Sequence, residues 1–256
     1  LYDVYLMTQF FNQSLRDTHI LLVDTRAASP LDHLWSDTFA SMTRLSQLPV
    51  RTQFDKLVWL YGRKYGPLLT KQRHVPLVSD FRRDILSVLG VDPNHVRECS
   101  KLNVLFVWRR NYLAHPRHPT GHVHRKISNE RELLNATKHA FPGYNIRGVQ
   151  LEKLPVKKQL ELVSRTDIFV AMHGAAFGFA LFLPPGGGAA ELYPINIVKN
   201  WHMQYLVRWA HVQYVLWRNR YPTNENTEQR STRVPPGDII DVIKSLISEI
   251  CPQVKV

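Results

Sequence analysis

The chain has 256 residues, of which 44% are hydrophobic, and it carries a formal net charge of +12. This size and composition predict one large or two modest globular domains and exclude a disordered protein, while the charge predicts an anionic partner: nucleic acid, acidic lipid or a phosphorylated small molecule. Two cysteines are too few for a disulfide scaffold or a cysteine zinc site.

The N-terminal third predicts helices around one short buried strand. The helices are expected over residues 2–15, 30–45 and 80–89, and the strand over residues 20–23. Four aspartates lie in these elements or at their ends: Asp3, Asp24, Asp32 and Asp37. A carboxylate at a strand end that faces a cleft can act as a general base, but each of the four also suits a helix cap or a turn.

From residue 103 onward, apolar runs of strand length alternate with amphipathic segments. The expected strands are 103–108, 146–151, 167–172, 189–192 and 212–217, and the expected helices are 129–141, 156–165, 175–183 and 238–250. This alternation predicts a parallel sheet that is covered on both faces, with ligands bound beyond the carboxyl ends of the strands. The apolar stretch from residue 167 is interrupted by His173 and Gly174, so strand and helix fit it better than a membrane span.

A stretch rich in arginine and histidine follows the strand that begins at residue 103. Arg109 and Arg110 end that strand and Arg125 precedes a helix, and arginine forks bind phosphate oxygens in bidentate fashion. A solvated basic loop explains the same pattern. The nearby histidines lack an adjacent cysteine or paired carboxylate, which argues against zinc, and no nucleic-acid-binding signature accompanies the charges.

A second candidate site is the turn formed by His173, Gly174 and Ala175, where a strand passes into a helix. Glycine allows close approach of a ligand to the backbone, and a helix N-terminus offers free N–H groups to phosphate. Glu191 ends the following strand, where it could accept hydrogen bonds from ribose hydroxyls. The alternative is a tight packing turn whose histidine is satisfied internally.

These segments also carry a resemblance to a known family. NVLFVWRRNYLAHPRH and HRKISNERELLNA closely resemble β-1,2-xylosyltransferases of the N-glycan core, and DIFVAMHGAAFGFALFLPPGGGAAELYP resembles their wider family of inverting glycosyltransferases, family 61. That family includes O-GlcNAc transferases of the secretory pathway. The resemblance implies a GT-B fold of the α/β class, in which two Rossmann-like domains face each other across a cleft and the last helix returns to the N-terminal domain. It places a shortened N-terminal, acceptor-side domain at residues 1–98 and the nucleotide-sugar-binding domain at residues 99–256.

The resemblance also implies roles for individual residues. Those that match the family's nucleotide-binding residues are Arg109, Arg125, His173, Gly174, Ala175 and Glu191. Arg110 is expected to bind the UDP-sugar as well, from its place beside Arg109. No paired carboxylates lie beside these residues in the sequence, so no metal or other cofactor is expected. Asp24 is the first candidate for the base, followed by Asp3 and Asp37. The sequence departs from the family at Asp3, where relatives carry histidine, and at Ala176 and Phe177 after the His-Gly-Ala turn.

The implied activity is transfer of xylose from UDP-xylose to the core β-mannose of N-glycans. An O-GlcNAc transferase and a catalytically inactive glycan-binding relative are the alternatives. We expect a Golgi or ER lumenal location with an anchor outside this sequence, and no nucleic-acid partner. Because the last helix of GT-B folds crosses back towards the N-terminal domain, Cys99 and Cys251 are expected to lie close enough for a disulfide.

Overall fold

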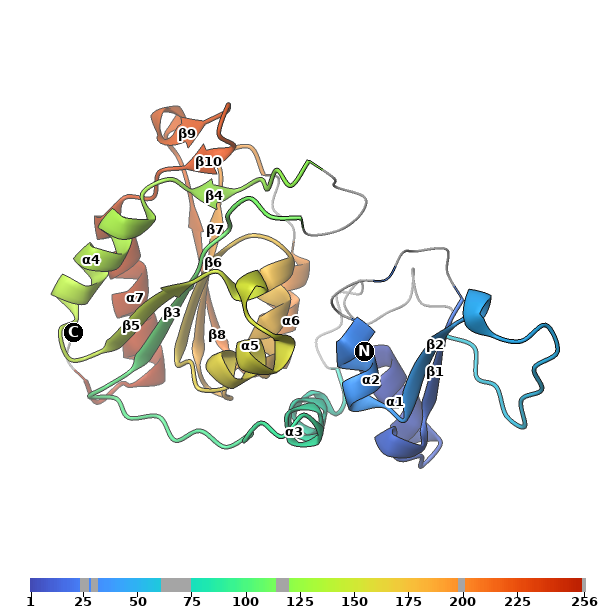
Figure 1. Cartoon of the computed structure of the whole chain (residues 1–256). Helices are drawn as coiled ribbons and strands as arrows, with labels where there is room; N and C mark the ends of the chain where they lie inside the picture. Colours follow the sequence, from blue (N-terminus) through green and yellow to red (C-terminus); the bar gives the residue numbers. More distant parts are fainter. Residues whose placement is uncertain (24–27, 29–31, 61–74, 114–119, 198–200, 255–256) are drawn as a thin grey trace. The chain divides into compact units, whose positions relative to one another are not determined.

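The computed structural model describes the chain except for residues 24–27, 29–31, 61–74, 114–119, 198–200 and 255–256. The chain divides into two compact units, Leu1–Val91 and Asp92–Val256 (Figure 1). The sequence analysis put the boundary after residue 98. The segment that begins at Asp92 instead joins the C-terminal unit, because His95 and Arg97 within it pair with the buried Asp167.

The N-terminal unit is built around a two-stranded parallel sheet. Its elements are α1 (Tyr2–Phe10), β1 (His19–Leu22), α2 (Asp32–Thr38), β2 (Ser41–Arg44) and α3 (Val78–Val88), with β1 paired to β2. The first helix ends before the expected residue 15, because Asn12 adopts a left-handed φ of 49° and Gln13 N–H donates back to Thr8 O. The expected helix over residues 30–45 is also shorter: Ala40 N–H donates to Thr18 O, and pairing with β1 turns the next residues into β2.

The C-terminal unit contains the predicted parallel sheet. Its five strands are β3 (Asn103–Val107), β5 (Asn145–Val149), β6 (Ile168–Met172), β7 (Gly188–Tyr193) and β8 (Gln213–Arg218). They lie side by side in the order β5-β3-β6-β7-β8, and every neighbouring pair is parallel. All residues of β6 and β7 are buried, as expected for strands covered on both faces.

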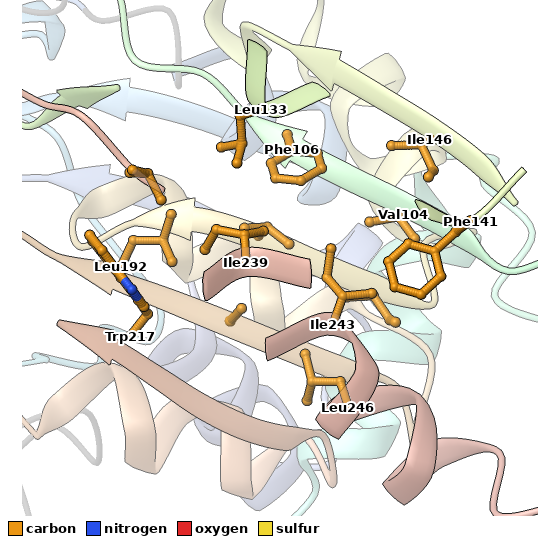
Figure 2. Close-up of a cluster of buried hydrophobic side chains, with 14 of the residues drawn as sticks. Val104, Phe106, Leu133, Phe141, Ile146, Leu192, Trp217, Ile239, Ile243 and Leu246 are labelled. Atoms are coloured by element: carbon orange, nitrogen blue, oxygen red, sulfur yellow. The ribbon is translucent and has the colours of Figure 1, made fainter. Parts of the chain in front are cut away.

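Helices cover both faces of this sheet (Figure 1). One face carries α4 (Glu130–Ala140) and α7 (Pro236–Ile250); the other carries α5 (Val156–Val163), the 3-10 helix η5 (Ala175–Phe182) and α6 (His202–Trp209). The expected return of the last helix to the N-terminal domain stays a prediction; within its own unit, α7 belongs to the core of the sheet. Ile239, Ile243 and Leu246 of α7 pack into this core (Figure 2).

A small second sheet lies near the carboxyl ends of the strands of the large sheet. It consists of β4 (Lys126–Ile127), β10 (Ser231–Thr232) and β9 (Glu225–Asn226), in the order β4-β10-β9. The backbone N–H of Ile195, just after β7, donates to Glu225 Oε1 at 2.9 Å, which ties this sheet to the end of the large one. Strands of two residues depend on their tertiary partners, so sequence patterns do not reveal them.

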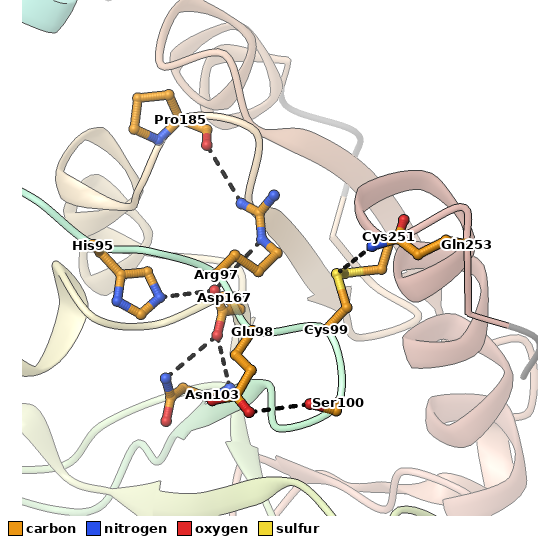
Figure 3. The surroundings of a disulfide bond; sticks show 10 residues. All are labelled: His95, Arg97, Glu98, Cys99, Ser100, Asn103, Asp167, Pro185, Cys251 and Gln253. Carbon is orange, nitrogen blue, oxygen red and sulfur yellow. Dashed lines mark hydrogen bonds and ion pairs between the residues drawn. A yellow bond between two sulfur atoms is a disulfide. The ribbon is translucent and has the colours of Figure 1, made fainter.

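The opposite end of the C-terminal unit is closed by a disulfide (Figure 3). Cys99, in the segment before β3, is bonded to Cys251 at the end of α7, which confirms the expected pairing. Beside it, the buried carboxylate of Asp167 accepts hydrogen bonds from the backbone N–H of Asn103 at 2.8 Å and from Asn103 Nδ2 at 3.3 Å, and it lies 2.9 Å from His95 Nε2. The entry segment and the last helix are therefore fastened at the amino ends of the strands.

In the parts of the chain that the structure describes, the helices are too short or too polar to cross a bilayer.

Candidate functional site

The sheet order creates one place where a ligand is expected. In chain order the five strands are arranged 2-1-3-4-5, so the connection after β3 leads to α4 on one face and the connection after β6 leads to η5 on the other. Ligands of such sheets bind in the crevice at this reversal, outside the carboxyl ends of the two strands. Arg109 follows β3 and His173 follows β6, so the strand order brings both candidate segments to this crevice.

Two arginines converge on Gly174 at this crevice. A Cβ built on Gly174 would lie 2.5 Å from Arg109 Nη1 and 3.5 Å from Arg125 Nη2. Gly174 also has a φ of +152°, which side chains rarely adopt. Any other residue here would displace the Arg109 guanidinium and strain the turn, which explains the glycine.

The positive charges of these two guanidinium groups are not balanced by an ion-paired carboxylate among the described residues. Burial lowers the pKa of Arg109, and the nearby charge of Arg125 lowers it further. Burial also lowers the pKa of Arg125, against the opposing effects of Tyr193 and Glu191. Among the described residues, neither arginine forms an ion pair with a carboxylate; Arg109 Nε donates to the carbonyl of His124 at 3.1 Å. Two half-buried like charges without an ion-paired carboxylate are a natural site for a multivalent anion.

Backbone strain is found at the same place. Arg125 and Arg230 both adopt left-handed backbone angles, with φ of 61° and 52°, immediately before the paired strands β4 and β10. Such angles cost energy for residues other than glycine and cluster at functional sites. The backbone N–H of Lys126, the residue after Arg125, donates to Arg230 O at 3.2 Å. This hydrogen bond links the two strained turns.

Arg110 differs from the other two predicted arginines. Its Nε donates to Glu130 Oε2 at 2.9 Å, and this hydrogen bond raises the pKa of Arg110. Glu130 is the first residue of α4. Arg110 therefore fastens the beginning of α4 and does not join Arg109 and Arg125 at Gly174.

His173 is held by a buried relay of polar side chains. Its Nδ1 lies 2.6 Å from Glu191 Oε1, and the hydroxyl of Tyr214 on β8 donates to Glu191 Oε2 at 2.5 Å. The His173 ring also stacks on Tyr193, with centroids 4.6 Å apart. Burial and the charge of Glu191 both raise the pKa of Tyr214, which therefore remains a hydrogen-bond donor.

This geometry changes the interpretation of Glu191. The sequence analysis expected its carboxylate to accept from ribose hydroxyls, but Glu191 is 0% exposed and both of its oxygens are engaged within the protein. In this arrangement it orients His173. Tyr214 was missed because nothing in the local pattern of β8 indicates a polar partner on the neighbouring strand β7.

The predicted base residues belong to the N-terminal part of the sequence. Asp24 lies outside the described residues. Asp3 is in the first turn of α1 and Asp37 is an exposed residue of α2, both in the N-terminal unit. Asp32, the fourth aspartate, forms an ion pair with Arg44 at 2.7 Å and so has a structural role.

The described residues also offer no grouping of three or more His, Cys, Asp or Glu side chains that could hold a metal ion. The positive charge at the crevice comes from the side chains of Arg109 and Arg125.

Known proteins are similar to this chain over most of its length. Residues 20–190 match the family described as Glycosyltransferase 61. The chain is similar to the EGF domain-specific O-linked N-acetylglucosamine transferase of Drosophila melanogaster, with 37% identity over 231 residues that cover 82% of this chain and 40% of the relative. The enzyme of the same name from Rattus norvegicus is 27% identical over 231 residues, covering 84% and 41%. A Beta-1,2-xylosyltransferase of Oryza sativa subsp. japonica is 29% identical over 144 residues, covering 54% and 27%. The chain thus spans about two fifths of the length of the first two relatives.

Proposed function

Because this chain belongs to the glycosyltransferase 61 family, as the sequence analysis expected, we propose that its C-terminal unit holds the diphosphate of a UDP-sugar at the crevice between β3 and β6. The convergence of Arg109 and Arg125 on Gly174 is the observation that carries this proposal. Bidentate arginine contacts suit the oxygens of a diphosphate. The backbone N–H groups after Gly174 and the ring of His173 add further donors at the same place.

The proposed reaction inverts the anomeric centre. A base takes the proton of the acceptor hydroxyl, the hydroxyl oxygen attacks the anomeric carbon in line, and the bond to the UDP oxygen breaks with its electron pair left on UDP. Arg109 and Arg125 stabilise the charge that develops on UDP, since fixed donors act strongly in a site that excludes water. For the base we keep Asp24 as first candidate, with Asp3 and Asp37 behind it.

We further propose that the reaction needs no metal ion, because the two arginines already supply the charge that a divalent cation supplies elsewhere. Turnover should persist after exhaustive treatment with EDTA. Loss of activity that is restored by added Mn²⁺ or Mg²⁺ would contradict this part of the proposal.

For the donor sugar we propose N-acetylglucosamine, transferred to a protein acceptor such as an EGF-like domain. The support is the Drosophila melanogaster relative, which matches 82% of this chain at 37% identity and carries that activity in its name. The second candidate is xylose, transferred to the core β-mannose of N-glycans. It is supported by the segments NVLFVWRRNYLAHPRH and HRKISNERELLNA and by the rice relative.

A donor and acceptor matrix tests these alternatives. The purified full-length protein is incubated with UDP-N-acetylglucosamine or UDP-xylose, and with a folded EGF-like domain or an N-glycan, and products are identified by mass. Products with UDP-xylose alone would select the second candidate. Tight UDP binding without any product would indicate a glycan-binding relative that is catalytically inactive. A lumenal location is also proposed, and the Cys99–Cys251 disulfide supports it because such bonds persist in oxidising compartments.

A further inference from the structure

A cavity of about 490 Å³ opens beside Arg109 at the beginning of α4. Its walls come from the residues after β3, from the first turn of α4, and from β4 and β10 of the small sheet. Arg109 lines this cavity and also reaches Gly174, so the cavity adjoins the proposed diphosphate site. None of the described residues that line it is aromatic. A nucleobase would therefore find no ring to stack on here.

Ser231 is the unusual residue of the cavity wall. It lies on β10 opposite Lys126, is 4% exposed, and its hydroxyl has no hydrogen-bond partner in the described structure. By contrast, the hydroxyl of the next residue, Thr232, donates to Glu225 Oε2 at 2.7 Å. A buried hydroxyl without a partner lowers stability, so a partner supplied by a ligand would explain why this position is polar.

The remaining groups of the wall favour a polar ligand that carries hydrogen-bond acceptors. Its carboxylates are engaged internally: Glu130 pairs with Arg110, and Glu132 pairs with Arg233. The side chain of Asn129 bonds to the backbone of Val234 and to Glu132 and does not cap α4, so N–H groups of the first turn stay available. Arg109 and Lys126 leave the wall with uncompensated positive charge.

We infer that this cavity receives the sugar ring of the donor, and that the hydroxyl of Ser231 hydrogen-bonds to a hydroxyl group of that ring. The inference rests on the proposed function, because the diphosphate on Arg109 is what brings the ring to the cavity. The missing aromatic surface points to the sugar in preference to the uracil, and the unpartnered hydroxyl matches a ring that carries hydroxyl groups. Ser231 is thus a residue that recognises the transferred sugar.

Two serine variants give a crossed test. Ser231→Ala removes a hydroxyl that has no internal partner, so the melting temperature should stay the same or rise, while affinity for the preferred UDP-sugar should fall about three- to tenfold. Ser164 is the matched control, since it is 0% exposed and its hydroxyl donates to Glu161 O at 3.2 Å. Ser164→Ala should lower the melting temperature and leave the affinity unchanged.

Calorimetric titrations with UDP, UDP-N-acetylglucosamine and UDP-xylose separate the outcomes. The inference expects Ser231→Ala to bind UDP as the wild type does and to lose affinity only for a UDP-sugar, with Ser231→Thr restoring part of it. Equal losses for UDP and UDP-sugar would place the ribose in the cavity and overturn the assignment. An unchanged affinity, or a fall in melting temperature as large as that of Ser164→Ala, would overturn it too. Failure of the wild-type protein to bind UDP would instead remove the proposed function.

Discussion

Replacing Tyr214 by phenylalanine probes the relay that holds His173. The variant keeps the ring and removes only the hydroxyl that donates to Glu191 Oε2 at 2.5 Å. Because Glu191 is 0% exposed, water cannot take the place of that donor. Hydrogen bonds to a charged group contribute about 1.5–3 kcal/mol, so we expect the free energy of unfolding to fall by about 2 kcal/mol. Affinity for UDP should fall about three- to tenfold, because His173 loses its fixed orientation.

Tyr5 provides the matched control in the other unit. Its hydroxyl donates to Asp84 Oδ2 at 2.7 Å, a bond of the same type, and its ring is 1% exposed. The Asp84 side chain is 32% exposed, however, so water can replace the lost donor. Tyr5→Phe should therefore cost less than about 1 kcal/mol and leave the affinity for UDP unchanged.

The assay combines urea unfolding with calorimetric titration of UDP, in single variants and in a double-variant cycle. If Tyr214 acts on UDP only through Glu191 and His173, then Tyr214→Phe should have no further effect on affinity in a His173→Gln background. Fully additive losses of affinity would refute this reasoning, as would a Tyr214→Phe protein whose stability and affinity both equal those of the wild type.

Four further predictions follow from the site and from the closure of the unit. Arg109→Ala should raise the dissociation constant for UDP by about 10- to 100-fold, measured by calorimetry, because one charge-assisted phosphate contact is lost. Cys99→Ser with Cys251→Ser should lower the free energy of unfolding by about 2–5 kcal/mol in urea, since the bond spans a sequence separation of 152 residues. Burial and His173 lower the pKa of His202 below 6.5, so protonation favours the unfolded state; stability should fall as pH decreases below about 6.5, and should fall less in His202→Gln. Asp24→Asn should reduce turnover by about 10²–10⁴ without weakening UDP binding; unchanged turnover would place the base elsewhere.

The large sheet could be predicted from sequence because its strands carry their own signal. Asn103–Val107 and Ile168–Met172 are continuous apolar runs, which is what strands buried on both faces require. The short elements could not be predicted. Ser41–Arg44 is mostly polar and lies within helical spacing, and it becomes a strand only because β1 is there to pair with.

The candidate site likewise has features that the sequence predicts and features that it does not. The proximity of Arg109 and Gly174 could be expected because parallel strands deliver the residues after their carboxyl ends to one edge of a sheet. Burial of individual side chains is not visible in a sequence, so Glu191 was assigned to a ligand although its oxygens serve His173 and Tyr214. Ser231 carries no local signal either, since its neighbourhood is created by the pairing of β10 with β4.

The Cys99–Cys251 bond also has a mechanical meaning. It joins the point where the chain enters the C-terminal unit to the end of α7, so the unit is a covalent ring. Tension applied between these two points passes through the sulfur bridge and bypasses the hydrogen bonds of the sheet. A single proteolytic cut in any surface loop between Cys99 and Cys251 opens this ring into one linear chain, in which the disulfide still joins these two residues. The nicked unit thus keeps every strand attached, as a circularly permuted protein does.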